Sequence, residues 1–460
     1  MLSPRGLSAS FAVLGLALAA TSFSHAGDIF KAKLYPEKKG TIADFQPMSK
    51  FCGTKPIKVA YSDGWGGNYW RHLARVEFED EASKCKNITD ARYTDGEFKP
   101  EKQIADIEGL VAQKYDVIVA QLDGGAAILK ATREATAAGV AVVPDSTGDN
   151  FAGRVGKDYV DIATESQIEY GELAAEWLAK TLGGKGNIIM LGGTPGNPMT
   201  SALTVGWRRA FAKHPDIKLL EQEPVPTMWD PAIAQQKTAA LIAKYPQIDG
   251  MFSETVGPIR AFVAAGRPIP VYAGQSLMDL SCITADHPEM KMMSLDAHTW
   301  MVRLALRKAV AAVQGIDNDE PSVVTLTIGE DTTSKDPKLA VKCDKSMPMG
   351  LDPVLNAVEG PTDQGPGREV SPGLTITDSG EVPGYAGRRH RLAQTFDRLI
   401  GTHASPKHGP RSTRKLRRNA GLKPAERPLE PNCSIFSGWR DPTQDRFSCC
   451  SRTVRAADCS

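Results

Sequence analysis

The chain has 460 residues, of which 41% are hydrophobic and 24% charged, and its formal net charge is +1. This length allows two or three domains with a sizeable core and excludes a small disulfide-stabilised module. A nearly neutral chain gives no general argument for a nucleic-acid or membrane-surface partner. The charge is nevertheless uneven, because residues 361–460 carry 17 basic and 10 acidic residues, whereas residues 27–360 carry 37 and 44.

The first 26 residues have the pattern of a secretory signal peptide. Arg5 is their sole charge, Phe11–Ala20 is an apolar run, and Ser24 and Ala26 are small residues at positions −3 and −1 of a cleavage site. The run is shorter than the roughly 20 residues that a membrane-spanning helix needs. We expect an exported protein that begins at Gly27 or Asp28. A buried N-terminal helix is the alternative.

Residues 27–54 are predicted to be a polar leader, and an α/β pattern follows them. Short apolar runs alternate with helical periodicity, which is typical of βα units around a parallel sheet. The expected elements over residues 55–161 are, in chain order, strand Ile57–Tyr61, a helix from about Asn68 to Lys84, a helix opened by Pro100, strand Val117–Ala120, a helix through Glu134 and strand Val140–Val143.

The pattern restarts over residues 162–295. Thr164 and Gln167 have the spacing of a capping box, which predicts that a helix begins there. The elements expected after it are strand Asn187–Leu191, a helix lined by Leu203, Trp207 and Phe211, strand Ile217–Leu220, a helix from Asp230-Pro231 to Lys244, strand Ile248–Phe252, a helix near Pro258–Ala265, strand Ile269–Ala273, a helix over Thr299–Val313 and a weak strand over Val323–Ile328.

Residues 346–460 are predicted to be a disordered, basic tail. Over residues 388–460, Leu, Ile, Val and Phe make up about 15% of the sequence, below the roughly 20% that marks disorder. Nucleic-acid binding by this basic stretch is a weak alternative in an exported protein. We hypothesise that the tail is an out-of-frame extension, and resequencing the coding DNA tests this, since a clean reading frame would contradict it.

The cysteines outside the tail are disulfide candidates. Export makes disulfides possible, and four cysteines allow three pairings. We favour Cys52 with Cys85 and Cys282 with Cys343, because each pair would tie a chain end to nearby structure; free buried thiols are the alternative. No CxxC spacing occurs among them, so we expect no metal site and no cofactor.

Polar and aromatic residues follow the predicted strands. In open parallel sheets, ligands bind beyond the carboxyl ends of the strands. Flat aromatic rings beside carboxylates and amides suit a neutral sugar or polyol, although each residue alone could equally be a core or capping residue. The residues at these ends are Asn68, Tyr69, Trp70, Arg71, Asp123, Asp145, Thr200, Trp229, Glu254, Thr255, Gln275, Ser276 and Asp296.

In order and spacing, residues 55–345 resemble the type I periplasmic binding proteins of ABC sugar importers, which include ribose-, xylose- and galactofuranose-binding proteins. The stretches that carry the resemblance are IKVAYS (57–62), GNYWR (67–71), PEKQIADIEGLVAQKYDVIV (100–119), GVAVVPDST (139–147), GNIIMLGG (186–193) and WDPAIAQQKTAALIAKYPQIDGMF (229–252).

The resemblance implies two doubly wound parallel-sheet lobes joined by a three-strand hinge. Lobe 1 would comprise residues 55–161 plus 297–320, and lobe 2 residues 162–296 plus 321–345. The crossings would lie near Asp161, Asp296 and Glu320. Ligand in the interlobe cleft would close the hinge, and permease subunits in the membrane would receive the closed, periplasmic form.

The resemblance also implies roles for single residues. Tyr69, Trp70 and Trp229 look like ligand-stacking aromatics, Asn68 and Arg71 like polar contacts, Asp145 like the carboxylate that binds sugar hydroxyls, and Asp296 like a polar hinge residue. Thr200 and Ser201 would contact ligand from lobe 2. The chain departs from the family at Ser146 and Ser201, where Arg is common, and at Thr255 and Ser276, where Asn and Asp are frequent. We therefore expect a less charged cleft.

Other classes of protein fit less well. An exported hydrolase needs a nucleophile or metal motif, but GQSLM at 274–278 lacks the last Gly of G-x-S-x-G, and His72, His214, His287 and His298 form no HExxH. We expect no catalytic residues. A repressor of this fold would begin with a helix-turn-helix. A periplasmic sensor that presents a sugar or autoinducer to a membrane receptor remains the alternative function.

Overall fold

The computed structural model describes residues 30–296, 299–347, 349–350 and 353. The predicted signal peptide lies outside the described residues. So do residues 354–460, and with them almost all of the predicted tail, so the hypothesis of an out-of-frame extension stays a hypothesis.

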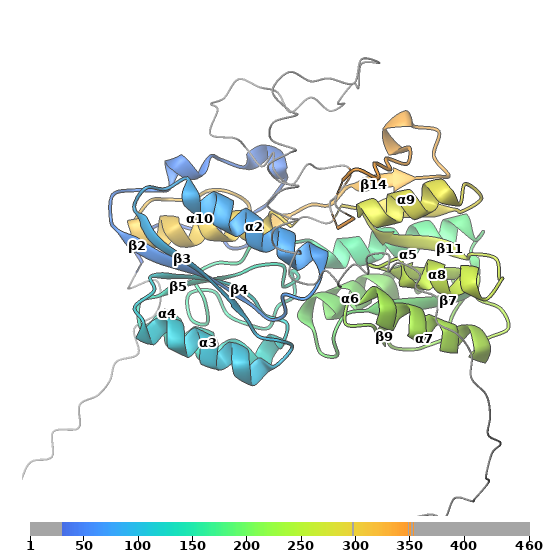
Figure 1. The fold of residues 1–460 in the computed structure, drawn as a ribbon, viewed down its shortest axis with the longest axis horizontal. Helices are drawn as coiled ribbons and strands as arrows, with labels where there is room; N and C mark the ends of the chain where they lie inside the picture. Colours follow the sequence, from blue (N-terminus) through green and yellow to red (C-terminus); the bar gives the residue numbers. More distant parts are fainter. Residues whose placement is uncertain (1–29, 297–298, 348, 351–352, 354–460) are drawn as a thin grey trace, which may run out of the picture. The chain divides into compact units, whose positions relative to one another are not determined.

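The first lobe is an all-parallel sheet with helices on both faces, in the order β3-β2-β4-β5. Helices α2 and α10 lie on one side of it in Figure 1, and α3 and α4 on the other. The strands are β2 (Ile57–Asp63), β3 (Ile88–Asp95), β4 (Val117–Gln121) and β5 (Ala141–Pro144), and the helices are α2 (Tyr69–Ser83), α3 (Pro100–Ala112), η3 (Gly125–Ile128), α4 (Leu129–Ala137) and α10 (Met301–Gln314).

Alternation along the buried strands explains these two layers. Successive side chains of a strand point to opposite faces. Val117 and Val119 therefore join the core under α2 and α10, whereas Ile118 and Ala120 join the core over α3 and α4. Because helices cover both faces of the sheet, residues 117–120 of β4 form a continuous apolar run.

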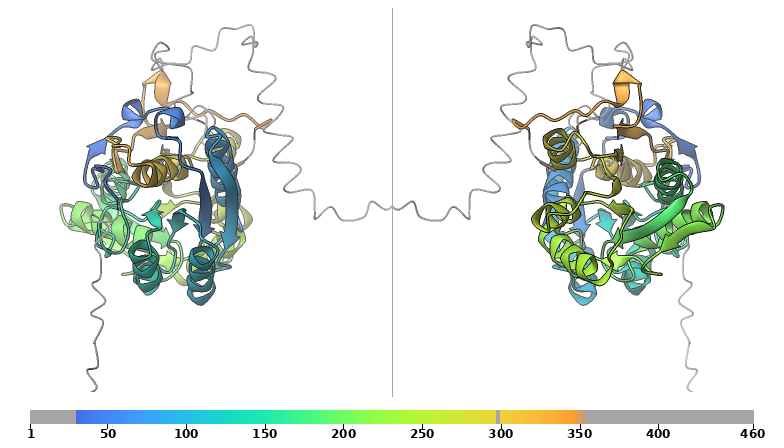
Figure 2. Two further views of the ribbon diagram at one scale, coloured as in Figure 1. Left: turned by 90° about the vertical axis from the view of Figure 1, so that its left-hand side faces the viewer. Right: turned by 90° about the vertical axis from the view of Figure 1, so that its right-hand side faces the viewer.

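The second lobe repeats this plan with a larger sheet, in the order β14-β12-β11-β10-β7-β8 with β9 paired to β7. Only the β12–β14 pair is antiparallel among the described strands of this sheet. Figure 2 views each lobe from its own end. The strands are β7 (Lys185–Gly192), β8 (Asp216–Leu219), β9 (Val225–Pro226), β10 (Gly250–Ser253), β11 (Val271–Gln275), β12 (Met292–Leu295) and β14 (Ile328–Asp331), and the helices are α5 (Gln167–Thr181), α6 (Pro198–Phe211), α7 (Pro231–Lys244), α8 (Gly257–Ala264) and α9 (Met278–Asp286).

A small parallel sheet lies where the chain passes between the lobes, in the order β1-β13-β6. Its strands are β1 (Lys39–Gly40), β13 (Val323–Val324) and β6 (Thr164–Glu165). The fold class predicted from the sequence, two doubly wound lobes with a three-strand connection, is confirmed.

Residues 30–54 are part of the folded structure, so the prediction of a leader before the fold was wrong for them. Besides β1 they form two short 3-10 helices, η1 (Ile42–Asp44) and η2 (Met48–Lys50). Phe45, Met48 and Phe51 are buried. These apolar residues are spaced along a polar segment. Phe45 and Met48 join the core of the first lobe, which includes residues of the distant helix α10.

The start of α5 also differs from its prediction. Thr164 belongs to β6, the N-cap is Ser166, and the Ser166 side chain makes no capping bond; Asp149 instead accepts from the Ile168 N–H in the first turn. The hydroxyl of Thr164 accepts a hydrogen bond from the Gly148 backbone and donates one to the Glu165 carbonyl. A capping-box spacing was therefore present, but pairing with β13 took the residue into the hinge strand.

Candidate ligand-binding site

The sheet topology creates one ligand-binding edge in each lobe. In the first lobe the order reverses between β2 and β4, and in the second between β7 and β10. The loops beyond the carboxyl ends of strands at such a switch point form a crevice. The polar residues that follow these four strands are therefore the natural candidates for ligand contacts.

Arg71 is held at the crevice of the first lobe by two carboxylates. Its guanidinium Nη1 donates to the Asp63 carboxylate at the end of β2. Its Nη2 donates to Asp123 Oδ1, beyond β4, at 2.9 Å. All three side chains are buried. Asn68 caps α2, because its Oδ1 accepts from the Arg71 backbone N–H, and so fixes the turn that carries Arg71.

The two lobes meet at this cluster. Asn197, the N-cap of α6 in the second lobe, donates from Nδ2 to Asp123 Oδ1 at 3.0 Å. The lobes also touch at two glycines of the first lobe: a Cβ added at Gly148 would lie 2.9 Å from the Ala202 Cβ, and one at Gly125 would lie 3.4 Å from the Gly196 carbonyl. Lobe 1 thus contacts the N-terminus of α6 directly.

Asp145 is the most unusual acid at the site. It follows β5, its exposed fraction is 0%, and neither carboxylate oxygen has a hydrogen-bond partner in the described structure. Burial raises its pKa to about 8, although Arg71 acts in the opposite direction. A buried, unpartnered carboxylate costs stability, so a residue of this kind is expected at a functional site.

In the second lobe, Trp229 and Glu254 form a pair. The indole Nε1 donates to Glu254 Oε2 at 2.7 Å, and both residues are buried. The ring lies against Gly193 after β7, where an added Cβ would come within 2.1 Å of it. Burial raises the pKa of Glu254 to about 7, although the bond from Trp229 favours the ionised form.

Backbone strain gathers in the same loops. Among the described residues, six other than glycine have positive φ, and five of them follow β3, β5 or β9: Glu97, Phe98, Ser146, Met228 and Trp229. Such conformations cost about 1–3 kcal/mol each and persist where the surroundings enforce them, often at ligand sites. The strain therefore points to the loops that hold Asp145 and Trp229.

The remaining predicted site residues fall into two groups. Trp70 is half-buried, its Nε1 has no hydrogen-bond partner in the described structure, and Asp296 is buried and bonds Thr327. Gln275 is half-buried at the end of β11. The others are less suited to ligand contact. Tyr69 is 49% exposed, and Ser201 is exposed and bonds the Asn197 carbonyl. The Thr200 hydroxyl already accepts from the Gly193 N–H, and the Thr255 hydroxyl lies beside Ser253.

Sequence reasoning missed Asp63 and Asn197 as site residues, and it noted Glu254 without selecting it. Asp63 was missed because its strand was predicted to end at Tyr61, whereas β2 runs on to Asp63. Asn197 had a detectable signal, since Asn before Pro198 is a strong helix N-cap. The expectation of a less charged cleft did not take Asp63 into account, which acts with the predicted Asp123 and Asp145 on the electrostatics around Arg71.

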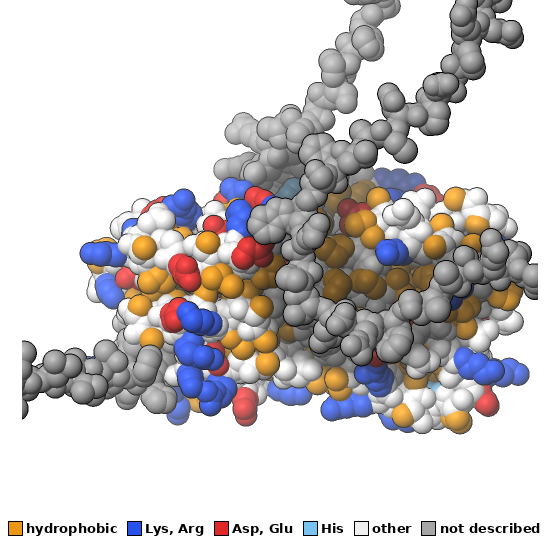
Figure 3. Space-filling view, turned by 90° about the horizontal axis from the view of Figure 1, so that it is seen from below, with side chains coloured by type: hydrophobic (Ala, Val, Ile, Leu, Met, Phe, Trp, Pro, Cys, Tyr) orange, Lys and Arg blue, Asp and Glu red, His pale blue; other side chains and the backbone are white. Residues whose placement is uncertain are grey.

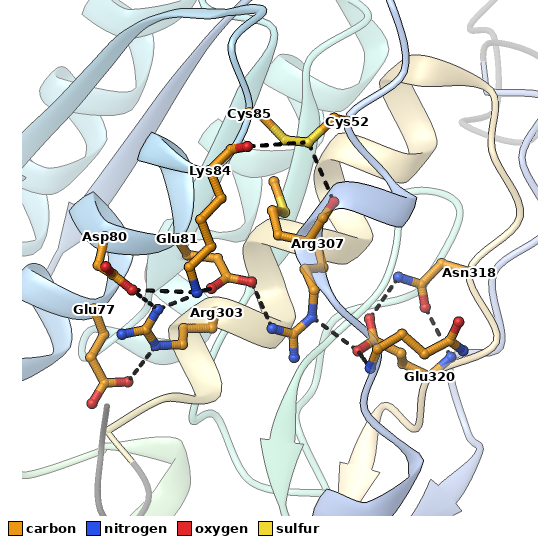
Figure 4. A network of polar contacts seen from close by, with 12 residues as sticks. Cys52, Glu77, Asp80, Glu81, Lys84, Cys85, Arg303, Arg307, Asn318 and Glu320 are labelled. Atoms are coloured by element: carbon orange, nitrogen blue, oxygen red, sulfur yellow. Dashed lines mark hydrogen bonds and ion pairs between the residues drawn. A yellow bond between two sulfur atoms is a disulfide. The ribbon is translucent and has the colours of Figure 1, made fainter. Parts of the chain in front are cut away.

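A buried network positions α2, and Figure 4 shows it. Arg303 and Arg307 of α10 both bond Glu81 of α2, and Arg303 also bonds Glu77. Arg307 bonds Glu320 at the crossing to the second lobe, 2.9 Å away. The helix that begins with Trp70 and Arg71 is thereby tied through α10 to the hinge.

Both disulfides favoured from the sequence are present in the structure, Cys52–Cys85 and Cys282–Cys343. The second anchors the segment of residues 343–347 and 349–350 to α9 of the second lobe. From there the segment reaches the first lobe, where Met347 packs against Leu73 of α2. Gly350 lies so close to α2 that an added Cβ would be 2.5 Å from the Tyr69 Cβ. This segment contacts both lobes beside the predicted aromatic residues.

Two further findings concern other kinds of site. Over the described residues, no three or more His, Cys, Asp or Glu side chains are grouped so that they could bind a metal, and no helix has the length and hydrophobicity to cross a membrane. On the face drawn in Figure 3, basic and acidic side chains are interspersed with apolar ones, without the one-sign field typical of a nucleic-acid surface.

Two αβ lobes, a hinge sheet between them and facing polar residues at their switch points define a two-lobed ligand-binding protein. The chain belongs to the periplasmic binding protein family, since the model of the periplasmic binding protein domain matches residues 59–317. The resemblance stated from the sequence is thereby confirmed.

Individual relatives are more distant. The chain is 29% identical over 160 residues to a xylitol-binding protein of Mycolicibacterium smegmatis, an alignment that covers 30% of this chain and 45% of that relative, so it spans less than half of the relative's length. A Caulobacter myo-inositol binding protein is similar in structure, with a TM-score of 0.53, 21% identity and coverage of 60% of this chain and 93% of its own. The fructose-binding periplasmic domain of a hybrid two-component system also matches, with a TM-score of 0.53, 19% identity and coverage of 60% and 91%.

Proposed function

We propose that this chain is the periplasmic solute-binding protein of an ABC transporter, which captures a sugar or polyol between its lobes and delivers it to permease subunits in the membrane. The observation that carries the proposal is Asp145, a fully buried carboxylate whose two oxygens lack donors in the described structure. Two hydroxyl groups of one polyol would supply donors to both oxygens.

The site is proposed to use both lobes. Trp70, Arg71 and Asp145 would contact ligand from the first lobe, and Trp229 and Glu254 from the second. Ligand closes a hinge only if it binds the closed form more tightly than the open one, which requires contacts on both sides. The Asn197–Asp123 hydrogen bond between the lobes supports a closed form that brings these groups together.

Known relatives support a polyhydroxylated ligand. The xylitol-binding relative and the structurally similar myo-inositol binding protein both carry polyols in their names. Their distance from this chain leaves the particular ligand open. Export to the periplasm is supported by the family and by the signal-peptide pattern of residues 1–26. We propose no catalytic activity, because members of this family bind solutes.

The proposal is tested by a thermal-shift screen of the purified full chain against sugars, polyols and their amine and acid derivatives. A ligand that binds the folded state raises the melting temperature by mass action. Calorimetry then measures the affinity of each hit, and solution scattering measures compaction on binding. If no polyhydroxylated compound shifts the melting temperature, the proposed function is wrong.

A sensor role is the second candidate, since one structurally similar protein is the periplasmic domain of a two-component system. Such a domain presents its ligand to a membrane receptor instead of a permease. The two roles predict the same binding result but different genetic neighbours. Genes for a permease and an ATPase beside this one would favour import, and a sensor-kinase gene would favour sensing.

A further inference from the structure

The charges at the cleft do not balance. The charges of Arg71, Asp63 and Asp123 all act on the pKa of Asp145. One cation, Arg71, is therefore grouped with three acids, Asp63, Asp123 and Asp145. On the side of the second lobe, the groups that act on Glu254 are the Trp229 indole and the Glu165 carboxylate, and neither is a cation. Among these described groups, acids therefore outnumber cations.

The one cation of this cluster is already engaged. Arg71 bonds the Asp63 carboxylate, and it also lies 2.9 Å from Asp123 Oδ1. Each terminal nitrogen of the guanidinium thus bonds one carboxylate. Arg71 is therefore not free to neutralise Asp145 as well, and it offers little positive charge to an anionic ligand.

Asp145 and Asp123 present acceptors that no described group satisfies. Both oxygens of Asp145 and the Oδ2 of Asp123 are buried without a hydrogen-bond partner. Both side chains are more than nine-tenths buried. Buried carboxyl groups without a partner are satisfied best by a donor with a positive charge, because it stabilises their ionised form and supplies up to three N–H bonds.

From these contacts we propose that the ligand is an amino polyol, a polyhydroxylated molecule with a protonated amine that binds at Asp145. This inference rests on the proposed function and narrows its ligand class. Hydroxyl groups would bond the other polar groups of the cleft, and the ring faces of Trp229 and Trp70 would cover the carbon skeleton. A sugar acid would place a further carboxylate among Asp63, Asp123 and Asp145, which costs repulsion and desolvation.

The test compares sets of three compounds that differ at one carbon. Glucamine, glucitol and gluconate, which differ at C1, form the open-chain set. 6-Amino-6-deoxyglucose, glucose and glucuronate, which differ at C6, form the pyranose set. An inosamine and its parent inositol extend the comparison to cyclitols. Calorimetry on the purified full chain gives the affinity of each at pH 7. We expect the amine to bind at least ten-fold more tightly than the alcohol in the set that fits the cleft, and the acid to bind most weakly.

The outcomes separate the two claims. If an alcohol or an acid binds as tightly as its amine, the amino-polyol inference is overturned while the proposed function stands. If no compound of these sets binds while another sugar or polyol of the thermal-shift screen does, the amino-polyol inference is overturned and the proposed function stands. If nothing in the screen binds, both fail. Tighter binding of the amine supports both.

Variants locate the amine. Asp145→Asn should reduce the preference for amine over alcohol to about three-fold or less, because the amide carries no charge to attract the ammonium group. Asp216→Asn is the matched control, since it makes the same change on the exposed strand β8. A preference that survives Asp145→Asn, in protein whose circular dichroism and melting are those of a folded chain, would place the amine elsewhere and overturn the assignment to Asp145.

Discussion

Two groups of buried carboxylates differ in their surroundings. Between α2 and α10, Glu81 bonds Arg303 and Arg307, and Glu320 bonds Arg307 and Asn318 (Figure 4). At the cleft, Asp145 is equally buried but has no donor on either oxygen in the described structure. Burial alone therefore does not single out the acid proposed to bind ligand, whereas burial with both oxygens unpartnered does.

The largest expected effect comes from breaking the paired group. Arg307→Ala would leave Glu81 and Glu320 buried without this cation, and removing one partner of a buried ion pair costs about 3–5 kcal/mol. Urea denaturation would measure the loss. Lys213→Ala is the control, because its partner Glu176 is at the surface and exposed pairs contribute about 0–1 kcal/mol. Equal losses in the two variants would contradict the structural role of the network.

Neutralising Asp145, the unpartnered acid, should raise the free energy of unfolding instead of lowering it. Burial raises the pKa of Asp145 from its ordinary 3.8 to about 8, in a surrounding of Arg71, Asp63, Asp123 and Tyr61. Between these pH values the unfolded chain releases the proton and the folded chain keeps it, so the wild type loses stability as pH rises. Asp145→Asn should therefore raise the free energy of unfolding at pH 8 by a few kcal/mol.

At pH 3 the same variant should differ little from the wild type, because Asp145 is protonated in the folded state and largely so in the unfolded one. Denaturation curves at both pH values check this. Since the carboxylate is proposed to bind ligand, the stabilised variant should also lose affinity. A variant that is less stable than the wild type at pH 8 would show that Asp145 has a partner in solution.

Loss of the aromatic faces should have a smaller effect. Trp229→Ala and Trp70→Ala should each cost about 1–3 kcal/mol of ligand affinity, the contribution of burying a large apolar side chain against ligand. Trp229→Phe separates two roles, because it keeps a ring but removes the N–H that bonds Glu254. Calorimetry with the best compound of the screen measures all three, and unchanged affinity in both alanine variants would contradict stacking.

The smallest expected effect concerns the contact between the lobes. Asn197→Asp keeps the oxygen that caps α6 but replaces the donor that bonds Asp123 with a second carboxylate. Loss of one hydrogen bond should weaken ligand binding by about 0.5–1.5 kcal/mol through the closed form. In solution scattering without ligand, the variant should be more extended than the wild-type protein. Identical curves would contradict a closed form held by the Asn197–Asp123 hydrogen bond.

Most elements of the two lobes could be predicted because buried parallel strands are short apolar runs between helices with clear periodicity. Val117–Gln121 and Pro231–Lys244 are such cases. The edge strand Ile88–Asp95 was missed because it is only partly buried and mixes polar with apolar residues. Helix α9 and strand β12 were missed as well, since each is short, although Pro288 after the helix is a stop signal.

The site was less predictable for a physical reason. A sequence indicates which residues follow a strand, and this was enough to select Arg71, Asp123, Asp145 and Trp229. It does not indicate which of them are already paired with one another. The pairing of Arg71 with Asp63 and Asp123 depends on three separate strand and helix ends that meet only in the folded lobe.

The strand at Lys39–Gly40 has a consequence for the order of folding. It pairs with Val323–Val324, so residues near the start of the first lobe find this neighbour only when the chain up to residue 324 is available. Helix α10, which completes the core of the first lobe, is also contributed late. If the chain threads through a membrane as residues 1–26 suggest, the lobe made first cannot close until the end has crossed. Folding that depends on contacts so distant in sequence is slow. Slow folding of the first lobe would keep the chain unfolded, the form that a translocation channel accepts.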